Sequence, residues 1–300
     1  MKILFTFPGQ GGQRPGMLSA LPDREAILTQ ARAVLGDEVD TLDSADALQH
    51  TRAVQLCLLI AGVAWARELQ RQGVDPQMVS GLSIGAFPAA VIAGALDFAS
   101  ALRLVALRGD LMEQAYSEGY GLTAIMGLTR PRVETLMQGH EVYLANLNAE
   151  TQFVIAGRDE AMAEVAQLAL RAGASKAQRL AVSVPSHCAL LDKPAAELAK
   201  AFAGASLRRP WCAYLSGSTA RVLWDPQRIA DDLAMNMARP VHWQEAMVAA
   251  DERDARLAIE MPPGGVLTCL TRQAGWRGET IALERSGLDV ARHLAQRLSD

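Results

Sequence analysis

The sequence predicts an α/β fold in which a large domain with a parallel-rich central sheet carries a small inserted α+β domain. Short buried strands alternate with helices in both outer parts of the chain. A glycine-flanked serine stands between a predicted strand and a predicted helix. Between these parts lies a single βαββαβ run. We expect the large domain to comprise residues 1–120 and 186–300, and the small domain residues 121–185.

The composition is typical of a soluble globular protein. Of 300 residues, 50% are hydrophobic and 21% are charged, with a net charge of -4. A nucleic-acid-binding protein usually has a basic excess, and aromatic residues are sparse here. The longest apolar run, residues 56–66, is shorter than the roughly 20 residues of a membrane helix. The N-terminal apolar stretch is too short for a signal peptide. We expect a cytoplasmic protein without nucleic-acid or membrane partners.

The cysteines give no sign of a disulfide framework or a metal site. Cys57, Cys188, Cys212 and Cys269 are widely spaced, and none belongs to a Cys-x-x-Cys pair. We therefore expect buried free thiols in a reducing compartment, and no bound metal.

In the first 120 residues, hydrophobic spacing defines the elements. A Gly-rich loop, residues 8–13, follows the first strand. Because residues 52–72 are apolar nearly all round through their first half, we expect that helix to be buried. The predicted strands are 3–7 and 74–80, and the predicted helices are 24–34, 52–72, 86–93 and 100–113.

The middle of the chain has a different character. Gly119-Tyr120-Gly121 interrupts the helical pattern. The following βαββαβ order is typical of a ferredoxin-like unit. Strand–helix alternation resumes near Ala213, Leu257 and Thr280, which makes this unit an insertion. Its predicted strands are 122–128, 142–146, 152–156 and 177–182, and its predicted helices are 131–138 and 159–172.

Ser83 is the candidate nucleophile. Gly81-Leu82-Ser83-Ile84-Gly85 matches Gly-x-Ser-x-Gly, the sharp strand-to-helix turn that exposes a serine hydroxyl. Glycine at both flanks permits close backbone approach. The pattern alone is also compatible with a structural Gly-rich turn. The strand–turn–helix context favours the nucleophile elbow, and with it a large domain similar to that of α/β-hydrolases.

His187 is the candidate base for this serine. It follows a predicted strand at the junction where the chain leaves the small domain, and active-site residues often lie on such loops. His50, His140 and His293 are better explained as surface or satisfied core residues. No acid stands out as a partner for the imidazole, because Asp192 is more typical of a helix N-terminus.

Two further features have alternative interpretations. The loop of residues 9–16 lacks the third glycine of a dinucleotide fingerprint and the lysine of a P-loop. Its backbone N–H groups suit an oxyanion instead. Arg108 lies on an otherwise apolar helix, where it either extends to solvent or grips a substrate carboxylate. Spacing alone leaves both interpretations open.

Five segments together resemble the malonyl-CoA:acyl-carrier-protein transacylase family, over nearly the whole chain. The resemblance implies an acyltransferase that moves a malonyl group from malonyl-CoA to a carrier-protein thiol, through an ester on serine and without a bound cofactor. The segments, in the order of the family's motifs, are Phe7–Gln13, Gly81–Gly85, Leu107–Gly109, Val182–His187 and Pro240–Trp243.

The resemblance also implies the catalytic roles. Ser83 would be the nucleophile and His187 the general base. The backbone carbonyl of Asn236, which stands where the family usually has glutamine, would orient the histidine in place of a carboxylate. The backbone N–H groups of Gln10 and Ile84 would form the oxyanion hole.

The substrate contacts and the departures from the family pattern point to a subfamily. By resemblance, Arg108 would bind the malonyl carboxylate, with Gln55 and Asn148 as further substrate-binding residues. Leu82 and Ala86 replace the histidine and glutamate that usually adjoin the nucleophile. With the segments 144–148, 230–236 and 260–264, these variants look most like the malonate decarboxylase epsilon subunit.

This subfamily implies that the acceptor is the acyl carrier subunit of malonate decarboxylase, with other subunits of that enzyme as further partners. The alternatives are the transacylase of fatty-acid synthesis, a serine hydrolase or thioesterase, and a non-catalytic carrier-binding subunit. Lys176, Arg179 or Arg272 could meet an acidic carrier, although each is more simply explained as a solvated charge.

Overall fold

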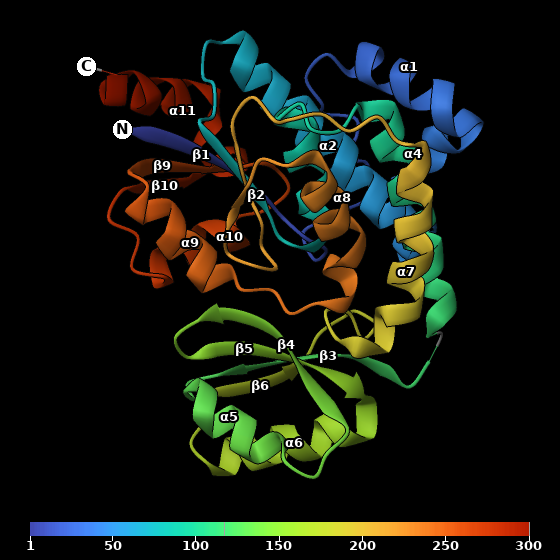
Figure 1. The fold of residues 1–300 in the computed structure, drawn as a ribbon, viewed down its shortest axis with the longest axis vertical. Coiled ribbons are helices and arrows are strands. Elements are labelled where there is room, and N and C mark those ends of the chain that lie inside the picture. Colours follow the sequence, from blue (N-terminus) through green and yellow to red (C-terminus); the bar gives the residue numbers. More distant parts are fainter. Residues whose placement is uncertain (117, 300) are drawn as a thin grey trace.

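A six-stranded sheet forms the centre of the larger part of the molecule (Figure 1). The computed structural model describes residues 1–116 and 118–299. The first five strands in the sheet order are parallel, and β8 joins the edge antiparallel to β7. The order is β10 (Glu279–Ala282), β9 (Ala255–Glu260), β1 (Lys2–Phe7), β2 (Met78–Gly81), β7 (Ala213–Leu215) and β8 (Val222–Leu223).

Both faces of this sheet are buried. Successive side chains of β1 point to opposite faces, and each set belongs to a hydrophobic core. Phe5 and Phe7 belong to one hydrophobic core, and Leu4 belongs to another. The helices of the first core are α1 (Arg24–Leu35), α2 (Thr51–Arg71), α3 (Ala86–Ile92), α4 (Phe98–Ala115), α7 (Asp192–Ala201), α8 (Pro226–Met235) and α11 (Leu283–Ser299). Those of the second core are α9 (Trp243–Glu252) and α10 (Val266–Gln273).

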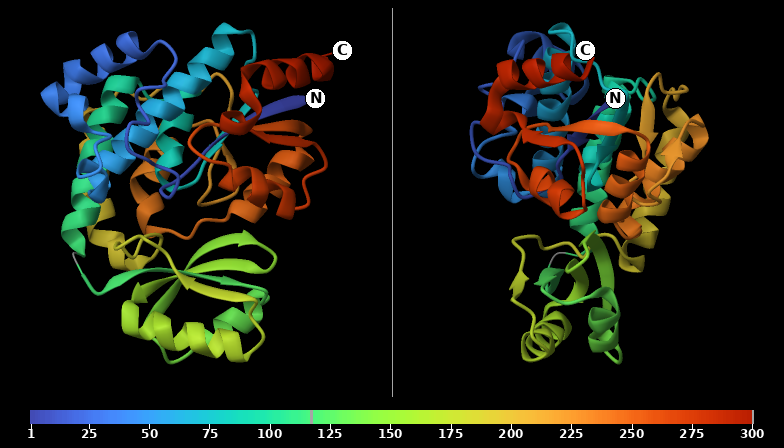
Figure 2. Two further views of the ribbon diagram at one scale, coloured as in Figure 1. Left: turned by 180° about the vertical axis from the view of Figure 1, so that it is seen from behind. Right: turned by 90° about the vertical axis from the view of Figure 1, so that its left-hand side faces the viewer.

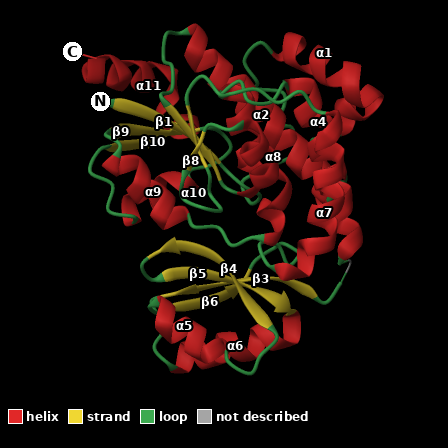
Figure 3. Cartoon of the chain, viewed as in Figure 1, coloured by secondary structure: helices red, strands yellow, loops and turns green. Residues whose placement is uncertain are grey.

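The four-stranded sheet lies apart from the first and has helices on its outer face (Figures 1 and 3). Its order is β4-β5-β3-β6, and every pair is antiparallel. Helices α5 and α6 pack on one face, whereas Cys188 and neighbouring residues of the returning chain cover the other. The elements are β3 (Tyr120–Met126), α5 (Arg130–Met137), β4 (Val142–Ala149), β5 (Gln152–Arg158), α6 (Asp159–Arg171) and β6 (Lys176–Arg179).

A short backbone ladder joins the two parts. The amide of Leu147 in β4 donates to the carbonyl of Val241 at 2.8 Å, and the amide of Val241 donates to Ala145 at 2.8 Å. Val241 lies between η6 (Asn236–Ala238) and α9. The small sheet is therefore attached to the segment that leads away from Asn236. The two chain ends lie near each other on the far side of the large part, as Figures 1 and 2 show.

The predicted elements are present, with end residues shifted by a few positions. The strand predicted over 74–80 begins only at Met78, and the last strand of the small sheet, predicted over 177–182, ends at Arg179. The Arg179 guanidinium donates to the carbonyls of Tyr120 and Val182, both at 2.7 Å. These two bonds link the returning chain at Val182 to Tyr120 of β3 beyond the end of β6. The predicted burial of the helix after residue 52 is confirmed, since α2 is buried over nearly all of its first half.

Three of the four cysteines are buried free thiols, as expected. Burial raises the pKa of the Cys188 thiol to about 11 and that of Cys212 to about 12, which makes both poor nucleophiles. The fourth, Cys269, lies exposed on α10, because that helix packs only one side against the sheet. None of the helices in the described part of the chain is long and apolar enough to span a membrane.

Candidate active site

Ser83 occupies a strained turn between β2 and α3. Its φ is +58°, in the left-handed region, at the start of the short helix η3 (Ser83–Gly85). A Cβ on Gly81 would collide with the backbone of Gly85, and a Cβ on Gly85 would collide with the carbonyl of Phe7. Both glycines are therefore required by close backbone contact. The strand–turn–helix predicted around Ser83 is therefore present, whereas its role as a nucleophile elbow stays a prediction.

The loop after β1 lies directly against this elbow. A Cβ on Gly9 would stand 3.1 Å from the Leu82 carbonyl oxygen and 3.7 Å from Ser83 Cβ. The next residue, Gln10, accepts a hydrogen bond at its Oε1 from the fully buried Gln55 at 3.3 Å. Gln10 thus follows the residue that contacts the elbow, which is consistent with an oxyanion hole built from Gln10 and Ile84. That role of their N–H groups stays a prediction.

Arg108 is fully buried on α4 and contacts Ser83. Its Nη2 donates to Ser83 Oγ at 3.2 Å and to Asn236 Oδ1 at 3.0 Å. Its Nε and Nη1 have no hydrogen-bond partner among residues 1–116 and 118–299. The guanidinium carbon lies 5.9 Å from the centre of the Phe87 ring. The solvent-extended interpretation of Arg108 is therefore wrong, since the side chain is 0% exposed.

A buried arginine with two unpartnered nitrogens is costly, because each unmet donor loses its hydration. Burial lowers the pKa of Arg108 to about 9, so the group remains charged at neutral pH. Within the described residues no carboxylate pairs with it. The site therefore holds an unneutralised positive charge next to a serine hydroxyl, which is suited to an anionic ligand.

His187 is held by backbone carbonyls. Its Nδ1 lies 2.8 Å from the carbonyl oxygen of Asn236 and 3.3 Å from that of Arg239. Because a carbonyl only accepts, Nδ1 carries the proton and Nε2 is left as the proton acceptor. The backbone is also constrained, with φ at +66° and the amide donating to Met237. The predicted contact between His187 and the Asn236 carbonyl is thus present.

Burial lowers the pKa of His187 to about 4, with the positive charge of Arg108 as the second cause. The imidazole is therefore neutral at physiological pH, as a general base must be. Among the described residues no hydrogen bond joins Ser83 to His187, since the serine oxygen accepts from Arg108 instead. Hydrogen bonds of a catalytic pair often tighten only when substrate is bound.

The side chain of Asn236 is the main feature that the sequence did not reveal. The family resemblance implies a role only for the backbone carbonyl of Asn236. In the structure its Oδ1 accepts from Arg108, and its Nδ2 donates to the Ser83 carbonyl at 3.3 Å. The sequence indicates that this position keeps an amide side chain, because asparagine replaces glutamine. It does not indicate which groups the amide contacts, because they lie 128 and 153 residues away in the chain.

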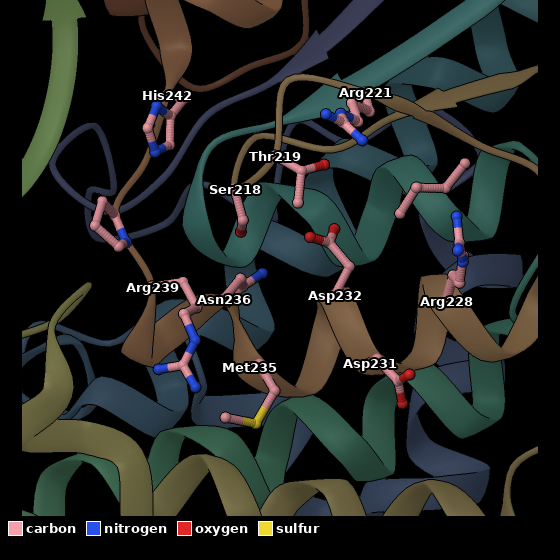
Figure 4. Close-up of a pocket in the computed structure, with 12 residues that line it drawn as sticks. Ser218, Thr219, Arg221, Arg228, Asp231, Asp232, Met235, Asn236, Arg239 and His242 are labelled. Atoms are coloured by element: carbon pink, nitrogen blue, oxygen red, sulfur yellow. The ribbon is translucent and has the colours of Figure 1, made fainter.

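A cavity of about 710 Å³ opens beside Asn236 (Figure 4). Its wall comes from α8, the loop that follows β7, and the segment that leads from η6 to α9. Arg221, Arg228 and Arg239 contribute positive charge, offset in part by Asp231 and Asp232. The lining residues are Ser218, Thr219, Arg221, Leu223, Arg228, Asp231, Asp232, Met235, Asn236, Arg239, Pro240 and His242.

Other predicted residues lie outside this cluster. Asn148 is buried in β4 with an unpartnered Oδ1, and no hydrogen bond in the described chain connects it to Ser83, Arg108 or His187. Arg179 is exposed, and its guanidinium also binds Asp159 and backbone carbonyls.

Arg272, another residue suggested to meet a carrier, donates to the carbonyl of Thr280 at 3.0 Å. Lys176 is exposed in β6. Asp192 lies in the first turn of α7, as predicted, where it pairs with Arg239 at 2.6 Å.

Comparison with known proteins is consistent with this site. The family model described as acyl transferase domain matches residues 4–286. The chain is 36% identical over 285 residues to malonyl CoA-acyl carrier protein transacylase of Escherichia coli K12, covering 91% of this chain and 92% of that protein. It is 32% identical over 295 residues to the Bacillus subtilis protein of the same name, covering 94% and 93%.

Solved structures agree over nearly the entire chain. The malonyl CoA-acyl carrier protein transacylase of Coxiella burnetii has a TM-score of 0.91 at 32% identity, covering 100% of this chain and 98% of that one. A malonyl-transacylase in complex with a type II polyketide-synthase acyl-carrier protein has a TM-score of 0.91 at 34% identity, covering 98% and 99%.

Proposed function

We propose that this chain, which belongs to the acyl transferase domain family, transfers a malonyl group from malonyl-CoA to the thiol of an acyl carrier protein. It is an acyltransferase by family and by its relatives. The observation that carries the substrate assignment is Arg108, a buried and unneutralised guanidinium that touches Ser83 Oγ. A carboxylate at the far end of a short acyl group is the ligand that such a guanidinium recognises.

In the proposed mechanism, His187 Nε2 takes the hydroxyl proton of Ser83 as the oxygen attacks the thioester carbonyl. The oxyanion that forms accepts from the N–H groups of Gln10 and Ile84. When the carbon–sulfur bond breaks, the coenzyme A thiolate takes the proton from His187, and a malonyl ester remains on Ser83. The carrier thiol then gives its proton to His187 and attacks the ester carbonyl. The bond from the carbonyl carbon to Ser83 Oγ breaks, Oγ takes the proton back from His187, and the malonyl group leaves as a thioester on the carrier.

We also propose that residues 121–185 act as a ferredoxin-like domain beside the α/β-hydrolase-like domain of residues 1–120 and 186–300. The β4 ladder to Val241, next to the Asn236 segment, supports a role in excluding water from the ester. Gln55 and Asn148 each carry a buried side-chain oxygen without a partner, which supports their assignment to substrate binding.

The identity of the carrier is a finer question. The departures at Leu82 and Ala86 favour the malonate decarboxylase carrier, and with it contacts to that enzyme's other subunits. Both residues adjoin the nucleophile rather than an outer surface, however, and Ala86 is only 3% exposed. The relatives described above are transacylases over their full length. We therefore place a carrier of the fatty-acid or polyketide type first, and the decarboxylase carrier second.

Labelled malonyl-CoA tests this function. Incubation is expected to leave a stable malonyl ester on Ser83, which a carrier thiol discharges. Rapid release of free malonate would instead identify a hydrolase or thioesterase. Absence of any label and of any released malonate would exclude both malonyl transfer and hydrolysis, and with them the proposed function. Parallel assays with the two kinds of carrier then identify the acceptor, since loading of the decarboxylase carrier alone would reverse our order.

Arg108→Ala is expected to change the acyl preference. The loss of the guanidinium removes the only charged partner proposed for the malonyl carboxylate, so kcat/KM for malonyl-CoA should fall by about a hundredfold or more. Acetyl-CoA has no carboxylate and should lose much less. Arg103→Ala, on the same helix but exposed, is the matched control. Steady-state kinetics with both donors measure the ratio, and an unchanged preference in Arg108→Ala would rule out the proposed contact.

The pH dependence should follow His187. The pKa of about 4 predicts that acylation is constant near neutral pH and falls as the pH drops through about 4, where the imidazole becomes protonated. Because the charge of Arg108 contributes to the lowered pKa, Arg108→Ala should move this acid limb to higher pH. The same measurement on Arg103→Ala should give the wild-type limb. Identical limbs in all three proteins would argue against His187 as the titrating base.

A further inference from the structure

Asn236 contacts three functional groups through three different atoms. Its carbonyl oxygen accepts from His187 Nδ1 at 2.8 Å. Its side-chain Oδ1 accepts from Arg108 Nη2 at 3.0 Å, and its Nδ2 donates to the Ser83 carbonyl at 3.3 Å. The residue is 5% exposed at the start of η6, so these bonds compete little with water. The two side-chain bonds are independent of the backbone contact that orients the base.

The bond to Arg108 determines which guanidinium nitrogens remain free. Nη2 is shared between Asn236 and Ser83, whereas Nε and Nη1 have no partner. The planar guanidinium has a rigid array of donors, so fixing one nitrogen fixes the direction of the others. With Nη2 held at the elbow, the plane of the guanidinium is fixed. Its unpartnered N–H groups, on Nε at one edge and on Nη1 at the opposite edge, are then presented to a carboxylate in fixed directions.

The neutrality of the asparagine amide is as important as its position. An amide oxygen accepts a hydrogen bond without cancelling the positive charge of its donor. A carboxylate at the same position would form a buried ion pair with Arg108 and neutralise it. An apolar residue would leave the guanidinium unoriented. Only a neutral acceptor both holds Arg108 and keeps its charge available.

We propose that the Asn236 side chain is the positioning residue that makes Arg108 selective for an acyl group with a free carboxylate. It acts as a neutral acceptor on Nη2 and fixes the plane in which the unpartnered N–H groups of Arg108 meet the substrate carboxylate. This inference rests on the proposed malonyl transfer. It assigns to the side chain a role separate from that of the Asn236 backbone carbonyl, which serves His187.

Two substitutions separate charge from orientation. Asn236→Ala removes both side-chain bonds and keeps the carbonyl. The ratio of kcat/KM for malonyl-CoA to that for acetyl-CoA should fall about tenfold, as expected for one lost hydrogen bond to a charged group. Asn236→Asp adds a carboxylate facing Arg108, which competes with malonate for it. The ratio should then fall on the order of a hundredfold, mostly through a higher KM for malonyl-CoA.

Gln227→Glu is the matched control for added charge, since it makes the same change from an amide to a carboxylate. Gln227 is exposed on α8 and does not line the cavity. This variant should keep the wild-type preference. A second readout is the acid limb of the pH profile, which should stay in place in Asn236→Ala because the carbonyl that holds His187 remains.

A purely structural role would lower the rates with malonyl-CoA and acetyl-CoA by equal factors. The inference is therefore wrong if either asparagine variant keeps the wild-type ratio. Its failure is distinguishable from failure of the proposed function. A wild-type protein that acquires no malonyl label removes the function itself. A wild-type protein that prefers malonyl-CoA, with variants that keep this preference, removes only the role of the Asn236 side chain.

Discussion

Ser83→Ala is expected to abolish the covalent malonyl-enzyme and to lower transfer by about 10⁴-fold or more, because no other group can form the ester. The change is small in volume, and the substituted residue already lies at a positive φ, so the elbow glycines should preserve the turn. Intact-mass spectrometry after exposure to malonyl-CoA measures the adduct directly, and a carrier-loading assay measures transfer.

Ser80→Ala is the matched control for this experiment. Ser80 lies three residues upstream, and its hydroxyl donates to the carbonyl of Leu215 at 2.9 Å. This variant should still acquire the malonyl mass, although it loses a buried hydrogen bond and some stability. An adduct that persists in Ser83→Ala would move the nucleophile to another residue and would contradict the mechanism proposed above.

His187→Asn is expected to lower acylation by about 10²- to 10⁴-fold, the usual contribution of a positioned general base. Asparagine is chosen because it tolerates the left-handed backbone at this position, where φ is +66°. Its amide can still donate to the Asn236 carbonyl, but it offers no basic nitrogen to Ser83. Pre-steady-state labelling with malonyl-CoA separates the acylation step from transfer to the carrier.

The control is His293→Asn, a substitution of an exposed histidine on α11. It should leave acylation at the wild-type rate. The acid limb of the remaining activity provides a second check on His187. If His187→Asn kept both the wild-type rate and the limb near pH 4, the proton acceptor would have to be another group.

Much of the fold was predictable because its signals are local. The elbow is the clearest case, since Gly81 and Gly85 are required by contacts within one turn and with the adjoining strand. The apolar residues in the first half of α2 likewise predicted that this helix is buried. The end of β6 could not be predicted, because it depends on Arg179 reaching carbonyls of Tyr120, 59 residues away. Of the four α-helices that the structure describes between residues 192 and 273, α7 was indicated by Asp192, and the other three only by the resumption of strand–helix alternation.

The residue types of the candidate site were also predictable, but the contacts between them were not. Family resemblance pointed to Ser83, His187 and Arg108, and the structure brings them together through Asn236. Resemblance to a subfamily was less informative, since Leu82 and Ala86 lie at the elbow and do not identify a carrier. The exposed state of Cys269 also depended on which side of α10 packs inward.

The sequence by itself determined the residue types of this protein's chemistry and the turn that presents the serine, because glycine, serine and the strand–helix pattern act within a few residues of one another. Only the tertiary structure decided that Arg108 is buried without a counter-charge, and that the Asn236 side chain holds it. Burial and hydrogen-bond partners arise when segments far apart in the chain pack together, and hydrophobic spacing does not encode those pairings.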